Sequence, residues 1–167
     1  MKALIMKDVC QAQVVETAVP DYTDRVLIGV SHCGICGSDL SCYTGKHPRA
    51  KLPLIGGHEF VGTVEAVGED CAFAPGDRVV VNPIYFCGRC RACLAGNGHV
   101  CENLRLYGID TDGGFAEYAA VPARQLFRLP EDIDLTQAAL IEPYACSFHC
   151  VERAQVTTTD FVVQSGV

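Results

Sequence analysis

The sequence has no apolar run approaching the ~18 residues that a membrane-spanning helix needs, and no repeat or low-complexity tract. It also lacks an excess of positive charge: 13 Lys and Arg face 20 Asp and Glu, for a net charge of −7. This balance leaves no basic footprint for nucleic acid or an anionic membrane surface. The first residues contain no signal-peptide pattern. We therefore expect a cytoplasmic protein that binds neither nucleic acid nor membrane.

Cysteine, by contrast, is abundant. The 167 residues include 11 cysteines, an odd number, without a secretory signal. In a reducing compartment such cysteines are expected to be metal ligands or buried thiols and not disulfides. The pair Cys33 and Cys36 has the spacing of a redox motif but lacks the strand-then-helix context of one. Six cysteines outside the motifs below are expected to be small buried hydrophobic residues: Cys10, Cys33, Cys42, Cys71, Cys146 and Cys150.

Four cysteines stand within one short, polar, glycine-containing segment: Cys87, Cys90, Cys93 and Cys101. Such a segment cannot offset its ordering entropy by burying apolar surface. Binding of Zn²⁺ by four thiolates can do so, since the free energy of metal binding becomes folding free energy, about 10–16 kcal/mol in zinc peptides. The pattern favours a structural zinc site over free cysteines or a disulfide framework.

A second possible metal site combines Cys36 with the neighbouring pair His58 and Glu59. Thiolate, imidazole and carboxylate ligands with a fourth position open are typical of catalytic zinc. The spacing alone is a weak signal, because the residues are far apart in the chain and a histidine beside a glutamate often serves packing. The alternative of an ordinary packing role therefore stays open at this point.

Most of the chain is predicted to form short strands, at residues 2–6, 12–16, 26–31, 60–67, 78–81 and 115–121, separated by Gly and Pro turns. This spacing suggests a barrel or sandwich. Asp134 and Gln137 resemble a helix capping box, and Pro143 is expected to break or kink the helix that follows. A second helix is predicted at 145–153, and residues 161–167 are expected to form a buried strand running into a glycine turn.

Together the motifs resemble those of the zinc-dependent medium-chain alcohol and polyol dehydrogenases. They are, in order, residues 36–39 (Cys-Gly-Ser-Asp), 57–60 (Gly-His-Glu-Phe), 75–79 (Pro-Gly-Asp-Arg-Val), the four-cysteine segment, 114–118 (Gly-Phe-Ala-Glu-Tyr) and 142–143 (Glu-Pro). The resemblance implies a mainly β protein with a few short helices, a GroES-like β-barrel carrying a structural zinc lobe. It further implies a catalytic domain at 1–153 and, at 154–167, the first strand of a dinucleotide-binding domain, with the chain truncated before the rest of that Rossmann domain.

The same resemblance assigns roles to single residues. It implies that Cys36, His58 and Glu59 hold a catalytic zinc, and that Cys87, Cys90, Cys93 and Cys101 hold a structural one. Ser38 matches the hydroxyl that passes the substrate proton onward, although it can also serve as a helix cap. Glu142 matches the sorbitol-dehydrogenase-like branch, where it is a catalytic-site carboxylate that ligates zinc directly or through water. Whether Glu59 or Glu142 is the direct ligand stays open.

The function implied is the NAD- or NADP-linked oxidation of a polyol, sugar alcohol or related secondary alcohol to the ketone. Two zinc ions per chain and a homo-oligomeric parent protein are part of that expectation. Without the dinucleotide-binding domain, the chain by itself is expected to be inactive. The alternative is a stand-alone zinc-binding β-barrel that acts as an interaction module without catalysis. The individual alcohol and the choice between NAD and NADP are left open.

Overall fold

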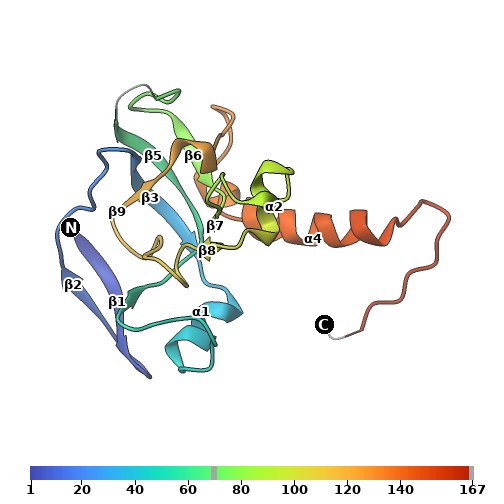
Figure 1. The fold of residues 1–167 in the computed structure, drawn as a ribbon, viewed down its shortest axis with the longest axis horizontal. Helices are drawn as coiled ribbons and strands as arrows, with labels where there is room; N and C mark the ends of the chain where they lie inside the picture. Colours follow the sequence, from blue (N-terminus) through green and yellow to red (C-terminus); the bar gives the residue numbers. More distant parts are fainter. Residues whose placement is uncertain (69–70, 166–167) are drawn as a thin grey trace.

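A computed structural model of the chain describes residues 1–68 and 71–165 (Figure 1). The strands are β1 (Lys2–Asp8), β2 (Gln11–Glu16), β3 (Val26–Gly34), β4 (Leu54–Ile55), β5 (Glu59–Val67), β6 (Arg78–Val81), β7 (Ile84–Tyr85), β8 (Arg105–Leu106), β9 (Tyr118–Val121) and β10 (Leu126–Arg128). The helices are α1 (Gly37–Tyr43), α2 (Arg91–Leu94), α3 (Leu135–Ala138) and α4 (Ile141–Ala154), with 3-10 turns η1 (Gly98–Val100) and η2 (Ala123–Gln125). This is the mainly β architecture with short helices that the sequence predicts.

The central element is a five-stranded antiparallel sheet in the order β10-β6-β5-β3-β9. Its strands are runs of β-branched and aliphatic residues, whose side chains pack well on a pleated surface. Their inward side chains form the main core around Phe60, Ile28 and Val64, and the ring of Phe60 meets Tyr107 edge to face. The predicted strand at 115–121 is shorter than expected, because regular pairing with β3 begins only at Tyr118.

A smaller sheet, β2-β1-β4, joins α1 to the barrel. Met6 of β1, Leu54 of β4, Ile109 and Cys42 of α1 form a second cluster of buried apolar side chains. Cys42 is 1% exposed and packs as a small hydrophobic residue. This cluster fixes the helix that begins after Cys36 against the rest of the domain.

The C-terminal helices differ in part from the expectation. Asp134 caps α3 as predicted, since its Oδ1 accepts a hydrogen bond of 2.7 Å from the backbone N–H of Thr136. The predicted break at Pro143 is wrong, because α4 runs without interruption from Ile141 to Ala154. Pro143 lies in the first turn, where a backbone N–H has no partner within the helix, so its missing donor costs nothing.

Beyond α4 the chain makes a turn at residues 157–160, and the strand expected at 161–167 is not formed over the described residues up to 165. Phe161 is 93% exposed. A strand needs a neighbour for its backbone groups, and α4 leads the chain away from every sheet in Figure 1. Residues 166–167, the expected glycine turn, lie outside the described residues. Within the described part of the chain, no helix is long and apolar enough to cross a membrane.

The expected burial of the six remaining cysteines is correct only for Cys42. Cys33 and Cys71 are half-buried, and Cys10, Cys146 and Cys150 are exposed. Cys146 and Cys150 lie on α4, where the sequence pattern alone did not show which face of the helix meets the barrel.

Substitution of Val64 by Ala should lower the free energy of unfolding by about 2 kcal/mol, because it removes two methyl groups from a closed core and leaves a cavity. Val64 is 1% exposed, whereas Val14 of β2 is 65% exposed. The matched control Val14→Ala should change the free energy by less than about 0.5 kcal/mol. Urea denaturation of both variants measures the difference, and equal losses would contradict the core described above.

Candidate metal centres

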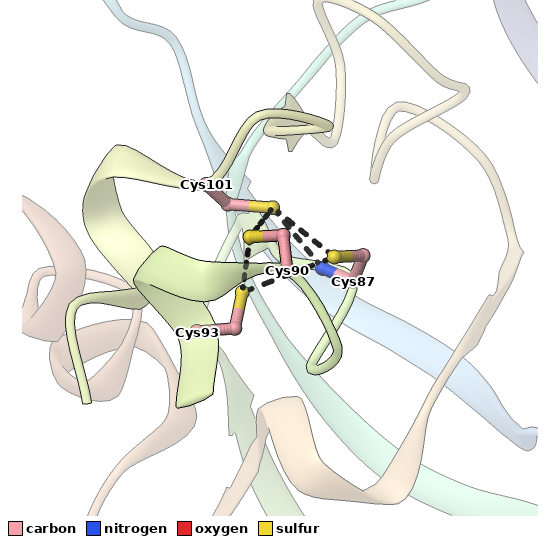
Figure 2. A group of neighbouring side chains, drawn as sticks. All are labelled: Cys87, Cys90, Cys93 and Cys101. Atoms are coloured by element: carbon pink, nitrogen blue, oxygen red, sulfur yellow. Dashed lines mark hydrogen bonds between the residues drawn. The ribbon is translucent and has the colours of Figure 1, made fainter. Parts of the chain in front are cut away.

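The four cysteines of the polar segment converge on one point (Figure 2). Cys87 follows β7, Cys90 caps α2, Cys93 lies within α2 and Cys101 follows η1. Neighbouring Sγ atoms are 3.4 Å apart for Cys90 and Cys93, 3.5 Å for Cys87 and Cys101, 3.8 Å for Cys90 and Cys101, and 3.9 Å for Cys87 and Cys93. A tetrahedral zinc with bonds of about 2.3 Å holds its sulfur ligands about 3.8 Å apart. The cluster therefore fits a structural zinc ion.

Backbone amides around the cluster favour thiolates. The N–H groups of Cys87 and Asn103 donate to Cys101 Sγ at 3.4 and 3.3 Å. The backbone N–H of Arg89, followed by that of Cys90, lowers the pKa of Cys87 to about 6. Gly88 has φ +75°, a left-handed conformation that lets the chain turn back within this donor loop. Local turns thus supply the geometry of a thiolate site and its polarity at Cys87, whereas burial and then the Cys90 side chain raise the pKa of Cys93 to about 12.

The second predicted metal centre, called the second group or second centre below, brings together residues that are distant in the sequence. Cys36 Sγ, a ring nitrogen of His58 and a carboxylate oxygen of Glu59 all lie within 4.8 Å of one another. Cys36 precedes α1, His58 lies in a buried turn, and Glu59 begins β5. One thiolate, one imidazole and one carboxylate match the donor set of a zinc site with an open position. The spacing leaves room for one ion, so the residues fit the predicted catalytic zinc.

Asp39 organises this second group, a role that the sequence analysis did not assign. Its side chain is 4% exposed, and its two oxygens accept hydrogen bonds from the backbone N–H groups of Cys36 (2.8 Å) and Gly57 (3.1 Å). Oδ1 also lies 3.7 Å from Nδ1 of His58. Burial by itself would raise the pKa of Asp39, but His58 and these amides lower it below its ordinary value. The available signal was the position of Asp39 three residues after Cys36, where a side chain can reach back to the start of α1.

His58 is oriented by its two neighbours. The Asp39 carboxylate raises the pKa of His58 to about 9. The other ring nitrogen, Nε2, lies 3.5 Å from the hydroxyl of Ser38. Nδ1 faces the Asp39 carboxylate at 3.7 Å, a distance beyond that of a hydrogen bond, and Nε2 is the nitrogen left available to a metal.

The backbone of residues 113–115 holds the segment before His58 in place. The N–H groups of Gly113, Gly114 and Phe115 donate to the carbonyls of Ile55, Gly57 and Gly56 at 2.8, 2.8 and 3.0 Å. At Gly113, a Cβ atom would lie 2.0 Å from the carbonyl oxygen of Gly57. Only glycine allows this close approach. The approach sets the position of His58 and of Glu59, the first residue of β5.

Glu142 lies beside the second group but outside it. It is half-buried at the start of α4, and its Oε1 is 3.8 Å from Sγ of Cys146. Burial raises the pKa of Glu142, with a further increase from Glu59 that His58 opposes. The three-residue ligand group contains Glu59 and not Glu142. The structure thus places Ser38 and Glu142 next to the predicted ligands without making Glu142 one of the converging donors.

Comparisons with known proteins agree with this arrangement. A family profile described as the alcohol dehydrogenase GroES-like domain matches residues 22–131. The 2-dehydro-3-deoxy-L-galactonate 5-dehydrogenase of Pseudoalteromonas atlantica is 39% identical over 89% of this chain and 44% of its own length. The sorbitol dehydrogenase of Halalkalibacterium halodurans is 37% identical over 85% of this chain and 42% of its own.

Among solved structures, the rspB alcohol dehydrogenase of Escherichia coli CFT073, in complex with NADH, superposes with a TM-score of 0.87. It is 37% identical, over 94% of this chain and 46% of that one. The chain thus spans about half the length of the relatives that it matches. From the profile match, the identities and the two cysteine-containing centres, we conclude that the chain belongs to the alcohol dehydrogenase GroES-like family, the N-terminal domain of the zinc-dependent medium-chain alcohol and polyol dehydrogenases.

Proposed function

We propose that the chain is the metal-binding part of an NAD(P)-linked dehydrogenase that oxidises a polyol, sugar alcohol or related secondary alcohol to the ketone. The observation that carries the proposal is the convergence of Cys36, His58 and Glu59 on one point. In this assignment residues 1–153 form the metal-binding domain, and residues 154–167 lead into the dinucleotide-binding domain. The names of the relatives support the substrate class, since both the galactonate and the sorbitol enzymes act on polyhydroxylated carbon chains.

The donor sets suit different roles for the two centres. A zinc ion at the second centre would supply a Lewis acid, which lowers the pKa of a bound oxygen from about 15.7 to roughly 7 in the case of water. Cys36 and Glu59 carry two negative charges and His58 none when it binds through Nε2, so this centre would be close to neutral. Four thiolates leave a net negative charge at the four-cysteine centre. Such a charge favours a structural role for the zinc ion over a role as a Lewis acid.

The residues around the second centre handle the substrate proton. Ser38 places its hydroxyl 3.5 Å from His58 Nε2, the ring nitrogen that would bind the zinc ion. In the proposed reaction, the substrate hydroxyl transfers its proton to Ser38, which releases one to water, and the carbon transfers a hydride to the nicotinamide of NAD(P)⁺. Asp39 holds His58 in position throughout. Glu142 provides a second, half-buried carboxylate that reaches the site through water in this proposal.

Two zinc ions per chain are expected in the purified protein. Cys36→Ser should leave one, because it removes the only thiolate of the second centre. Cys90→Ser should also leave one and, in addition, make the segment between Cys87 and Cys101 sensitive to proteolysis, because the metal replaces a core there. Elemental analysis and limited proteolysis measure both effects. Cys150→Ser, at an exposed position on α4, is the matched control and should retain both ions. Two ions in Cys36→Ser would refute the second centre.

Asp39→Asn should weaken zinc binding at the second centre about 10–100-fold, because it removes the carboxylate that orients His58. The measurement is competition against a chromogenic chelator, with the four-cysteine centre of the same molecule as an internal reference. Asp132→Asn, at an exposed loop position, is the control and should leave both affinities unchanged. An equal loss of zinc from both centres in Asp39→Asn would indicate general unfolding and contradict the positioning role.

In the full-length protein with its dinucleotide-binding domain, Ser38→Ala should lower kcat by about 100-fold or more, as expected for loss of a proton-transfer group. Its zinc content should stay at two, since Ser38 is not a ligand. Turnover of a polyol panel with NAD⁺ and NADP⁺ provides the measurement. Ser41→Ala, one turn further along α1, is the matched control. Normal kcat in Ser38→Ala would remove the residue from the reaction, and a stand-alone interaction module would show no turnover in any variant.

A further inference from the structure

A second concave site lies between the four-cysteine segment and the five-stranded sheet, away from Cys36 and His58. It is a pocket of about 340 Å³. Three arginines line it: Arg25 just before β3, Arg89 between two of the cysteine ligands, and Arg105 on β8. Tyr107 and Thr111 also line it, and none of its lining residues in the described part of the chain is acidic.

The charge of this pocket contrasts with the rest of the molecule. The chain carries a net charge of −7, yet three arginines line one cavity. Among the described residues, none of the three lies within 4.0 Å of a carboxylate oxygen. Cys87 also lines the pocket, so the arginines face part of the four-thiolate centre. Three positive charges nevertheless exceed the two negative charges that four thiolates leave around one Zn²⁺.

The inner wall offers polar groups without protein partners. Tyr107 is 4% exposed, held by its edge-to-face contact with Phe60, and its hydroxyl makes no hydrogen bond to a described residue. The Oγ1 atom of Thr111 is buried and likewise has no partner among the described residues. Unpaired buried hydroxyls are costly unless a ligand or water satisfies them. The unpaired Thr111 hydroxyl, on the wall of a pocket lined by arginines, points to an oxyanion as its partner.

The three lining arginines are exposed residues, and the fold constrains two of them. Arg105 stands opposite Tyr85 in the β7-β8 pair, and Arg25 donates to the carbonyl of Ala120 at 3.3 Å. A fourth arginine, Arg124, lies over the Tyr85 ring at 5.3 Å and adds positive charge behind the wall. Guanidinium groups held in this way match the planar, multiple acceptor geometry of phosphate oxygens.

We propose that this pocket is a binding site for a phosphate group, either inorganic phosphate or the phosphate of a small metabolite. Arg25, Arg89 and Arg105 supply the charge, and Tyr107 and Thr111 donate hydrogen bonds from the inner wall. The site does not depend on the proposed dehydrogenase function, because it shares no residue with the second metal centre. The segment between Tyr107 and Gly113 runs from this pocket to the turn that holds His58.

The test is a calorimetric titration of the zinc-loaded protein with inorganic phosphate, at constant ionic strength maintained with chloride. We expect saturable binding of one phosphate with a dissociation constant on the order of 1 mM, as for a few charge-assisted hydrogen bonds in an open pocket. Arg25→Gln and Arg105→Gln should each weaken binding about tenfold. Arg91→Gln is the matched control, because Arg91 is exposed on α2 in the same lobe but does not line the pocket.

Zinc content and thermal unfolding of each variant separate binding from stability. Retention of two zinc ions with weaker phosphate binding in Arg25→Gln and Arg105→Gln supports the site. Competition between phosphate and glycerol phosphate for the same site would show that phosphate esters also bind. The proposal is overturned if binding is not saturable, if Arg91→Gln weakens it equally, or if Arg25→Gln and Arg105→Gln bind phosphate normally. Loss of zinc from both of these variants would assign the arginines to neutralising the thiolate centre and also overturn it.

Discussion

The buried carboxylate of Asp39 connects the segments that carry Cys36 and His58, on which the proposed chemistry of the protein depends. It accepts hydrogen bonds from the amides of Cys36 and Gly57 and lies beside the ring of His58, so one side chain connects α1 with the turn that precedes β5. A buried carboxylate is stable only when such donors satisfy it. The group of Cys36, His58 and Glu59 is therefore positioned by a polar group within the domain, and a metal ion would meet ligands that are already near one another.

The two centres illustrate two ways of building a metal site. The four-cysteine centre is local: all its ligands come from one segment whose turns direct the thiols inward, and little apolar packing supports it. The second centre is non-local and depends on the barrel, since β5, α1 and the backbone of residues 113–115 must all be in place before its donors meet. The first centre can gain its stability from the metal itself, whereas the second uses stability that the core provides.

The segment from Tyr107 to Phe115 connects several features of the molecule. Tyr107 packs on Phe60 in the core, Thr111 lines the arginine pocket, and Gly113 to Phe115 form the hydrogen bonds that hold the turn before His58. Close backbone approach at Gly113 leaves no space for a side chain, so this segment has little freedom to move independently of the turn. A ligand in the arginine pocket would therefore contact the same stretch of chain that supports the second metal centre.

Much of this could be predicted from the sequence because the signals are local. The spacing of Cys87, Cys90, Cys93 and Cys101 predicted a metal site without knowledge of the fold, and runs of β-branched and aliphatic residues between turn signals located most strands. The approach of Cys36 to His58 came only from resemblance to a family, because spacing rules cannot predict how the 21 intervening residues fold. The sequence pattern also gave two wrong predictions. It predicted a helix break at Pro143, but the first turn of a helix tolerates proline. It predicted a strand at 161–167, but no neighbouring strand is present for residues 161–165 within the described part of the chain.

By itself, then, the sequence determined the mainly β character, the clustering of four cysteines in one segment and the residue types available for a second donor group. The tertiary structure alone decided which of these residues meet: that Glu59 joins Cys36 and His58 while Glu142 stays beside them, that Asp39 orients the histidine, and that three arginines from separate segments face one pocket. The physical reason is that ligand type and turn chemistry act over a few residues, whereas the distance between remote side chains depends on how the whole core packs.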